Sequence, residues 1–280
     1  MERNGRADKI KFMIGIFDSG IGGLTVVKEV LKTLPDYQIL YLGDTARLPY
    51  GNRSQALIYK FTVQAVDYLF KQGCQLVIIA CNTASSEALR KIQQEWLPKN
   101  YPDRRVLGVI RPVVEEAAKV SRFGRVGVIG TRGTISSESY IKELKNQKQD
   151  VIVSQAACPL LVPIVEEGMQ NRRETKMILR NYLRPLKLKK VDTLIMGCTH
   201  YPILQKKIKS IMGKSCNVLD TSAIVAESLK DYLNRHTEIE SKLVKGKEHR
   251  YIVTDSTDRF KENAQNWLGQ KIKLEKIDLE

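Results

Sequence analysis

Short apolar segments recur along the chain, and each one is followed by a turn and then by apolar residues at helical spacing. These segments lie at residues 12–17, 38–42, 75–80, 106–110, 125–130, 151–155 and 193–197. Strands that alternate with helices in this way are typical of parallel βαβ units with right-handed crossovers. We therefore predict an α/β fold with mainly parallel sheets flanked by helices, and ligand binding at the carboxyl ends of the strands.

Two of these segments share one layout, which amounts to an internal repeat. An apolar strand leads through one small residue to the sequence CNT at residues 81–83, and another leads in the same way to CTH at residues 198–200. Both continue into a helical pattern. The turn at residues 18–23 (DSGIGG) has a similar counterpart at residues 130–134 (GTRGT). The repeat predicts two similar domains that face each other across a cleft.

We place the join between these domains near Gly108. The segment 106–110 would open the series of strands of the second domain, and the segment 251–254 would return to the first domain as an appendage. The predicted ranges are residues 1–107 plus 220–280 for the first domain, which carries Cys81, and residues 108–219 for the second domain, which carries Cys198.

The chain has five cysteines and no CxxC pair, so a disulfide framework is not expected. Cys81 and Cys198 each lie where a strand passes into a helix. Unpaired N–H groups and the positive end of the helix dipole at such a junction would lower the thiol pKa from about 8.5. A buried cysteine chosen for its size is the alternative reading at either position. Two cysteines in matching places suit a substrate held between two acid/base groups, whereas Cys74, Cys158 and Cys216 have no partner motif.

The chain is basic, with 46 lysine and arginine residues against 31 aspartate and glutamate residues, a net charge of +15. A surplus of this size can indicate a nucleic-acid partner or an acidic substrate. The densest basic stretches are KLKK at residues 187–190 and KLVKGK at residues 242–247, and no aromatic residues are interleaved with them. We interpret both stretches as solvated helix ends or loops, so a nucleic-acid partner is not expected.

No apolar run approaches the ~18 residues that a membrane span requires. The first residues (MERNGRADKIKF) carry charge without the apolar core of a signal peptide. We therefore expect no membrane association, a cytoplasmic location, and disorder in the polar leader before residue 12. The three histidines, His200, His236 and His249, show no metal-ligand spacing, so no metal is expected. Composition leaves open a lysine that holds pyridoxal.

Six motifs and a seventh near the end of the chain then give a specific resemblance. In order they are GIFDSGIGGLTV, YLGDTARLPYG, ACNTAS, GVIGTRGT, CPLLVPIVEEG, MGCTHYP and YIVTD. In this combination, over nearly its whole length, the chain resembles the glutamate racemase family of the aspartate/glutamate racemase group. The resemblance implies racemisation of glutamate, the supply of D-glutamate for peptidoglycan, and use of neither pyridoxal nor a metal. It also makes a homodimer a reasonable expectation.

The same resemblance implies a mechanism with two thiols. One cysteine thiolate removes the proton from the α-carbon, and the other thiol returns a proton to the opposite face. Cys81 would deprotonate D-glutamate and Cys198 would deprotonate L-glutamate. Without a cofactor as electron sink, the carbanion must be stabilised by fixed hydrogen-bond donors.

Candidate site residues follow from their chemistry and from the resemblance. Asn82, Thr83 and Thr199 can offer donors to a carboxylate, and Asp18 can accept from an ammonium group. His200 could polarise a thiol or accept its proton, or it could be satisfied by a backbone carbonyl. By resemblance, the catalytic residues are Cys81, Cys198, Asp18, His200 and Glu166, the substrate-binding residues are Asp18, Ser19, Tyr50, Gly51, Asn82, Thr83, Thr199 and His200, and Asp44 is a second-tier candidate.

Some alternatives remain at this point. A glutamate in a helical pattern, such as Glu166, is usually only solvated, and Ser19 could belong to a strained turn. The chain departs from the family pattern at GVIRPVV around Arg111, which bears on the hinge or the entrance between the domains. The alternative functions are a racemase for aspartate or another acidic amino acid, and a non-catalytic basic binding protein on the same fold.

Overall fold

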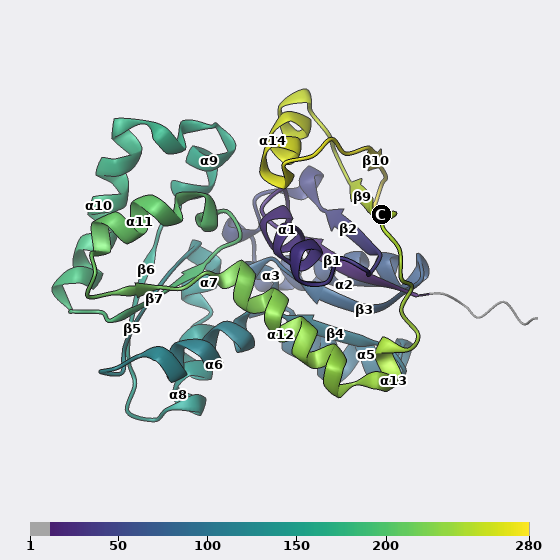
Figure 1. Ribbon diagram of the computed structural model, residues 1–280, viewed down its shortest axis with the longest axis horizontal. Coiled ribbons are helices and arrows are strands. Elements are labelled where there is room, and N and C mark those ends of the chain that lie inside the picture. The colour runs from purple at the N-terminus through teal and green to yellow at the C-terminus, as the bar shows by residue number, and fades with distance from the viewer. Residues whose placement is uncertain (1–11, 280) are drawn as a thin grey trace, which may run out of the picture.

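Two parallel sheets with helices on their faces form the molecule (Figure 1). The computed structural model describes residues 12–279, so the polar leader for which we expect disorder lies outside the described residues. The strand order is β10-β9-β2-β1-β3-β4 in the six-stranded sheet and β6-β5-β7-β8 in the four-stranded sheet. Every pairing between these strands is parallel. The predicted α/β class with parallel sheets is therefore confirmed.

The strands of the six-stranded sheet are β1 (Met13–Asp18), β2 (Ile39–Gly43), β3 (Cys74–Ile79), β4 (Arg105–Gly108), β9 (Arg250–Val253) and β10 (Leu274–Lys276). Those of the four-stranded sheet are β5 (Arg125–Gly130), β6 (Ile152–Ala157), β7 (Thr193–Gly197) and β8 (Asn217–Val218). The prediction that the segment at 106–110 opens the second series is wrong, because β4 pairs with β3 at the edge of the six-stranded sheet. The return of β9 to that sheet, beside β2, is confirmed.

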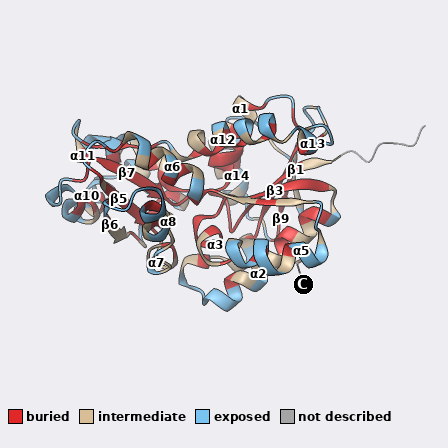
Figure 2. Ribbon diagram, turned by 90° about the horizontal axis from the view of Figure 1, so that it is seen from below, coloured by how far each residue is buried: buried red, intermediate tan, exposed pale blue. Residues whose placement is uncertain are grey.

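Helices cover both sheets, and buried residues are concentrated on the strands between them (Figure 2). The α-helices are α1 (Leu24–Thr33), α2 (Gln55–Lys71), α3 (Asn82–Glu87), α4 (Leu89–Lys91), α5 (Leu97–Asn100), α6 (Ile110–Val120), α7 (Arg132–Ser136), α8 (Ser139–Gln147), α9 (Leu161–Glu166), α10 (Arg173–Leu188), α11 (Gln205–Met212), α12 (Thr221–Arg235), α13 (Thr237–Glu240) and α14 (Asp258–Leu268). Shorter turns are η1 (Thr45–Arg47), η2 (Tyr50–Asn52), η3 (Ile92–Trp96), η4 (Met169–Asn171) and η5 (Tyr201–Leu204). Among residues 12–279, no helix has both the length and the apolar character to cross a membrane.

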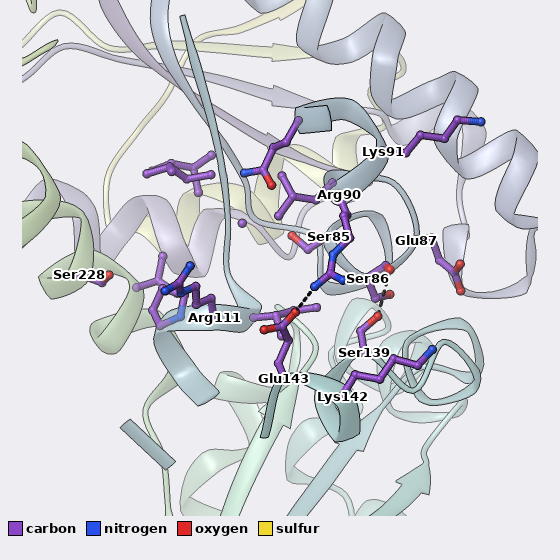
Figure 3. Close-up of a pocket in the computed structure, with 18 of the residues that line it drawn as sticks. Ser85, Ser86, Glu87, Arg90, Lys91, Arg111, Ser139, Lys142, Glu143 and Ser228 are labelled. Atoms are coloured by element: carbon purple, nitrogen blue, oxygen red, sulfur yellow. Dashed lines mark hydrogen bonds and ion pairs between the residues drawn. The ribbon is translucent and has the colours of Figure 1, made fainter. Parts of the chain in front are cut away.

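A cavity of about 1320 Å³ lies at the junction of the two halves, where α3, α6, α8 and α12 meet (Figure 3). Arg111, where the chain departs from the family pattern, is the second residue of α6 and pairs with Glu115 at 2.8 Å. Arg111 is one of the described residues that line this cavity, whereas Cys81 and Cys198 are not. The departure at Arg111 therefore shapes this cavity and not the space at the two cysteines.

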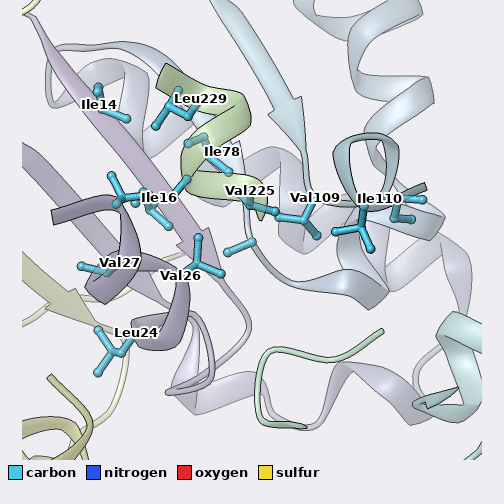
Figure 4. Close-up of a cluster of buried hydrophobic side chains, with 14 of the residues drawn as sticks. Ile14, Ile16, Leu24, Val26, Val27, Ile78, Val109, Ile110, Val225 and Leu229 are labelled. Carbon is cyan, nitrogen blue, oxygen red and sulfur yellow. The ribbon is translucent and has the colours of Figure 1, made fainter. Parts of the chain in front are cut away.

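The largest buried cluster joins the two halves of the molecule (Figure 4). Ile16 of β1, Val27 of α1 and Ile78 of β3 pack in the same cluster as Val225 of α12 and Ile110 of α6. Helix α12 contacts α1 on the six-stranded side and both α6 and β7 on the four-stranded side. Because burial of one such aliphatic side chain contributes about 1.5–3 kcal/mol, this shared core holds the two sheets in a fixed relation.

Candidate active site

The carboxyl ends of β1, β3 and β7 bring the two motif cysteines and Asp18 into one buried region. Asp18 is the last residue of β1, Cys81 lies two residues beyond β3, and Cys198 directly follows β7. The two sides are joined by the Thr199 hydroxyl, which donates a hydrogen bond of 3.2 Å to Asp18 Oδ1. Cys81 and Cys198 are only 5% and 6% exposed, so the site is closed to bulk solvent.

Cys81 is held as a neutral thiol. It caps the amino end of α3, and its Sγ accepts from the Ala84 N–H at 3.5 Å while its S–H donates to the Ser19 hydroxyl at 3.3 Å. Burial, with a contribution from the Asp18 charge, nevertheless raises the pKa of Cys81 to about 12. The Ala84 N–H at the helix start does lower the pKa of this thiol, but the predicted net fall is wrong, because the loss of hydration in the buried site outweighs the donors at the helix end.

The surroundings of Cys198 differ from those of Cys81. The residues after Cys198 form a turn and then the short helix η5, and α11 begins only at Gln205. A helix therefore follows this cysteine and its polar pair as predicted, but it begins as the short 3-10 turn η5, three residues beyond Cys198. The polar partner of Cys198 is His200, whose Nδ1 lies 3.8 Å from Cys198 Sγ.

His200 forms the centre of a chain of polar groups. Its Nε2 lies 2.9 Å from Glu166 Oε1, and its ring is almost fully buried. Burial alone would lower the His200 pKa, but the interactions with Cys198 and Glu166 outweigh burial and raise it to about 10. An imidazolium is therefore available beside the Cys198 sulfur. The structure thus brings Glu166 and His200 together, and the alternative of a merely solvated Glu166 is not what it shows.

Asp18 is completely buried, and burial raises its pKa above the usual value, although the His200 charge and hydrogen bonds from Gly20, Gly23 and Thr199 oppose the rise. The turn after it needs small residues. A Cβ at Gly22 would lie 2.2 Å from Thr199 Oγ1 and 2.5 Å from His200 Nδ1. The glycine in this turn therefore allows the four-stranded side to approach the end of β1.

The loop that carries Tyr50 and Gly51 is fixed by Asp44. The Tyr50 hydroxyl and the Thr254 hydroxyl, the latter at 3.0 Å, both donate to the Asp44 carboxylate, and Arg47 pairs with it at 2.7 Å. The Tyr50 hydroxyl is thus already engaged, which leaves the backbone of this loop to face a ligand. A Cβ at Gly51 would lie 2.8 Å from Thr131 Cβ, so glycine is needed where the loop meets α7.

Asn82 and Thr83 reach across to the four-stranded side. The Tyr140 hydroxyl donates to Asn82 Oδ1 at 2.6 Å. The hydroxyl of Thr83 lies 2.9 Å from that of Thr131 and 3.2 Å from that of Thr134. Sequence reasoning missed these three partners, although the repeated turn at residues 130–134 pointed to two of them.

Helix α14 comes from the six-stranded side and packs against His200 and Glu166. The Trp267 ring meets the His200 ring edge-on, with centroids 5.7 Å apart, and Asn263 Nδ2 donates to the Glu166 carbonyl at 2.9 Å. No sequence signal had linked this helix to the site. Among residues 12–279, no group of three or more histidine, cysteine, aspartate or glutamate side chains is placed to hold a metal ion.

The chain is similar to known proteins over most of its length. The Asp/Glu/Hydantoin racemase family matches residues 19–229. A glutamate racemase of Sulfurihydrogenibium is 43% identical over 267 residues, which cover 95% of this chain and 97% of that protein. The structure of a glutamate racemase isoform from Bacillus anthracis has a TM-score of 0.88 at 35% identity, and covers 96% of this chain and 98% of the other.

A second solved structure is that of a glutamate racemase from Francisella tularensis in complex with D-glutamate. It has a TM-score of 0.86 at 34% identity, and the match covers 97% of this chain and 99% of that one. The fold and these similarities define an isomerase of the racemase class. More particularly, the chain belongs to the Asp/Glu/Hydantoin racemase family.

Proposed function

We propose that the protein interconverts L- and D-glutamate by proton transfer at the α-carbon, with Cys81 and Cys198 as the two acid/base groups. The observation that carries this proposal is the placement of the two cysteines at corresponding strand ends of the two sheets, linked through the Thr199–Asp18 hydrogen bond of 3.2 Å. The similar Francisella protein in complex with D-glutamate supports glutamate as the substrate.

In the proposed L-to-D direction, the Cys198 thiolate takes the α-proton and the Cys81 thiol gives its proton to the opposite face. The C–H bond breaks on one side as an S–H bond forms, and the reverse exchange occurs on the other side, so no electrons are gained or lost overall. The high pKa of Cys81, about 12, suits a group that starts as the proton donor. The His200 imidazolium, 3.8 Å from Cys198 Sγ, would stabilise the anionic sulfur.

The substrate would be held by groups from both sides of the site. We assign Asp18 to the substrate ammonium, and the donors of Ser19, Asn82 and Thr83 to the α-carboxylate and to the charge that develops on it. Because the Thr199 hydroxyl donates to Asp18, we assign the backbone N–H of Thr199 to the same carboxylate. Because the Tyr50 hydroxyl is bound to Asp44, we assign the backbone of Tyr50 and Gly51 to the side-chain carboxylate. The closed site then replaces hydration with fixed donors at the moment of proton transfer.

On the family resemblance, we also propose that the D-glutamate serves peptidoglycan synthesis in the cytoplasm and that the enzyme works as a homodimer. No cofactor is assigned a role in the proton transfer.

The experiment incubates the purified chain with each enantiomer of glutamate in D2O without added cofactor. Circular dichroism follows racemisation, and proton NMR follows replacement of the α-proton. We expect both enantiomers to reach the same racemic mixture, with deuterium at the α-carbon of the product. Unchanged optical activity with either enantiomer would overturn the proposal, and faster racemisation of aspartate than of glutamate would correct the substrate.

A further inference from the structure

A tyrosine from the four-stranded side binds one of the candidate substrate-binding residues of the six-stranded side. The hydroxyl of Tyr140, in the first turn of α8, donates a hydrogen bond of 2.6 Å to Asn82 Oδ1. We propose that Tyr140 is a positioning residue that sets the orientation of the Asn82 amide, so that Asn82 Nδ2 faces the substrate. This inference rests on the proposed function.

The chemistry of the amide group explains why its orientation matters. An asparagine side chain presents an acceptor oxygen and a donor NH2 group that differ little in shape. A carboxylate needs the donor, and the opposite orientation would set the Asn82 oxygen against the negative charge. Burial keeps the Tyr140 hydroxyl protonated, because it raises the pKa of this tyrosine well above its usual value. Tyr140 is therefore a permanent donor, and the Asn82 oxygen is the partner it selects.

The backbone around Tyr140 is built to aim this side chain inward. Glu138, the residue before α8, has a left-handed backbone with φ of 55°, which is unfavourable for a residue with a Cβ. This turn starts α8 at Ser139 and places the Tyr140 ring in the core, with only 1% exposed. Gly197, directly before Cys198, leaves room for the ring, because a Cβ there would lie 3.1 Å from Tyr140 Cε2.

Two further contacts join the same two sides of the site beside this hydrogen bond. The Ser139 hydroxyl donates to the Ser86 carbonyl of α3 at 3.1 Å, and Arg90 of α4 pairs with Glu143 of α8 at 2.6 Å (Figure 3). All of them join α8 to the helical segment that starts at Asn82. These contacts hold Tyr140 in place beside Asn82. Tyr140 thus keeps the Asn82 amide in the orientation that can bind a carboxylate.

The test is a double-mutant cycle on the full-length enzyme, with kcat and KM measured for L- and D-glutamate. The variants are Tyr140→Phe, Asn82→Ala and the double variant. Loss of one well-placed hydrogen bond corresponds to about a tenfold change. We expect Tyr140→Phe to lower kcat/KM by about tenfold for both enantiomers, mainly through KM, and to have less than about a twofold effect when Asn82 is already alanine.

The control is Tyr101→Phe, which removes a hydroxyl that donates to Asp67 at 2.7 Å, outside the candidate site. This variant should keep the wild-type kcat/KM. An unchanged kcat/KM in Tyr140→Phe would overturn the inference, as would an equal loss in both Asn82 backgrounds, because a purely structural tyrosine acts independently of Asn82. If the phenylalanine variant does not fold, Tyr140→Met serves in the same cycle. Failure of the wild-type enzyme to racemise glutamate would instead overturn the proposed function, and this inference with it.

Discussion

The contact between Glu166 and His200 gives a prediction whose size can be worked out from the structure. Glu166 Oε1 lies 2.9 Å from His200 Nε2, and the His200 pKa is raised to about 10 from its usual 6.5. The change Glu166→Gln keeps the shape and one possible hydrogen bond but removes the negative charge. The imidazolium then loses one of the two partners that offset its burial, so its pKa must fall.

The expected fall follows from the strength of a hydrogen bond to a charged group. Such a bond contributes about 1.5–3 kcal/mol, and one pKa unit corresponds to ~1.4 kcal/mol. The Glu166 side chain is 31% exposed, which favours the lower half of this range because water screens the pair. We therefore expect the His200 pKa to fall by about one to two units, to between about 8 and 9.

The assay is an NMR titration of the imidazole groups, with His236 and His249 as internal references. The matched control is Glu167→Gln, because the neighbouring Glu167 pairs with Arg259 at 2.6 Å and does not contact His200. The basic limb of the pH profile for L-glutamate should shift to lower pH in Glu166→Gln only. A His200 pKa that stays near 10 in this variant would refute the reasoning that the carboxylate holds the proton on the ring.

Three further predictions concern the rest of the molecule. Gly22→Ala puts a Cβ 2.2 Å from Thr199 Oγ1, so we expect loss of racemisation and a lower melting temperature. Wild-type values of both would contradict the close packing of Gly22 against Thr199. Tyr50→Phe removes the hydrogen bond to Asp44, so we expect the free energy of unfolding in urea titrations to fall by about 1–2 kcal/mol and KM to rise. Unchanged values would contradict the role of this hydrogen bond in fixing the loop. Burial raises four thiol pKa values to about 12 from 9.0, so these thiols stay neutral in the folded state while the unfolded chain ionises above its own thiol pKa. Stability should therefore fall as pH rises from about 9 towards 12, and equal stability in urea at pH 8 and pH 10.5 would contradict this. The four are Cys74, Cys81, Cys158 and Cys216.

Local sequence patterns predicted much of the fold. The strand at Arg125–Gly130 has the bounds expected from its apolar run. The region after Cys81 was less regular than its pattern, because the helix breaks at Ala88 and contains a π-helical turn at Ile92–Trp96. The placement of β4 could not be predicted, since the choice between two sheets depends on long-range pairing and not on periodicity.

The candidate site also combines features that local patterns predict with features that depend on long-range contacts. Matched motifs were enough to pair Cys81 with Cys198, because both follow buried strands of the same kind. The pKa of Cys81 was predicted in the wrong direction, because burial is a property of the closed tertiary structure and no local pattern reports it. The Tyr140–Asn82 and Trp267–His200 contacts also escaped prediction, since each joins residues more than fifty positions apart.

The most direct test of the account is the behaviour of Cys81→Ala and Cys198→Ala, with Cys216→Ala as a control for loss of a buried thiol. Each of the first two variants should lose racemisation by at least about a hundredfold, the usual contribution of one acid/base group, whereas the control should keep it. In D2O, any remaining exchange of the α-proton should be confined to L-glutamate in Cys81→Ala and to D-glutamate in Cys198→Ala. Full racemisation by either variant, or residual exchange on the opposite enantiomer, would contradict the assignment of one thiol to each face of the substrate.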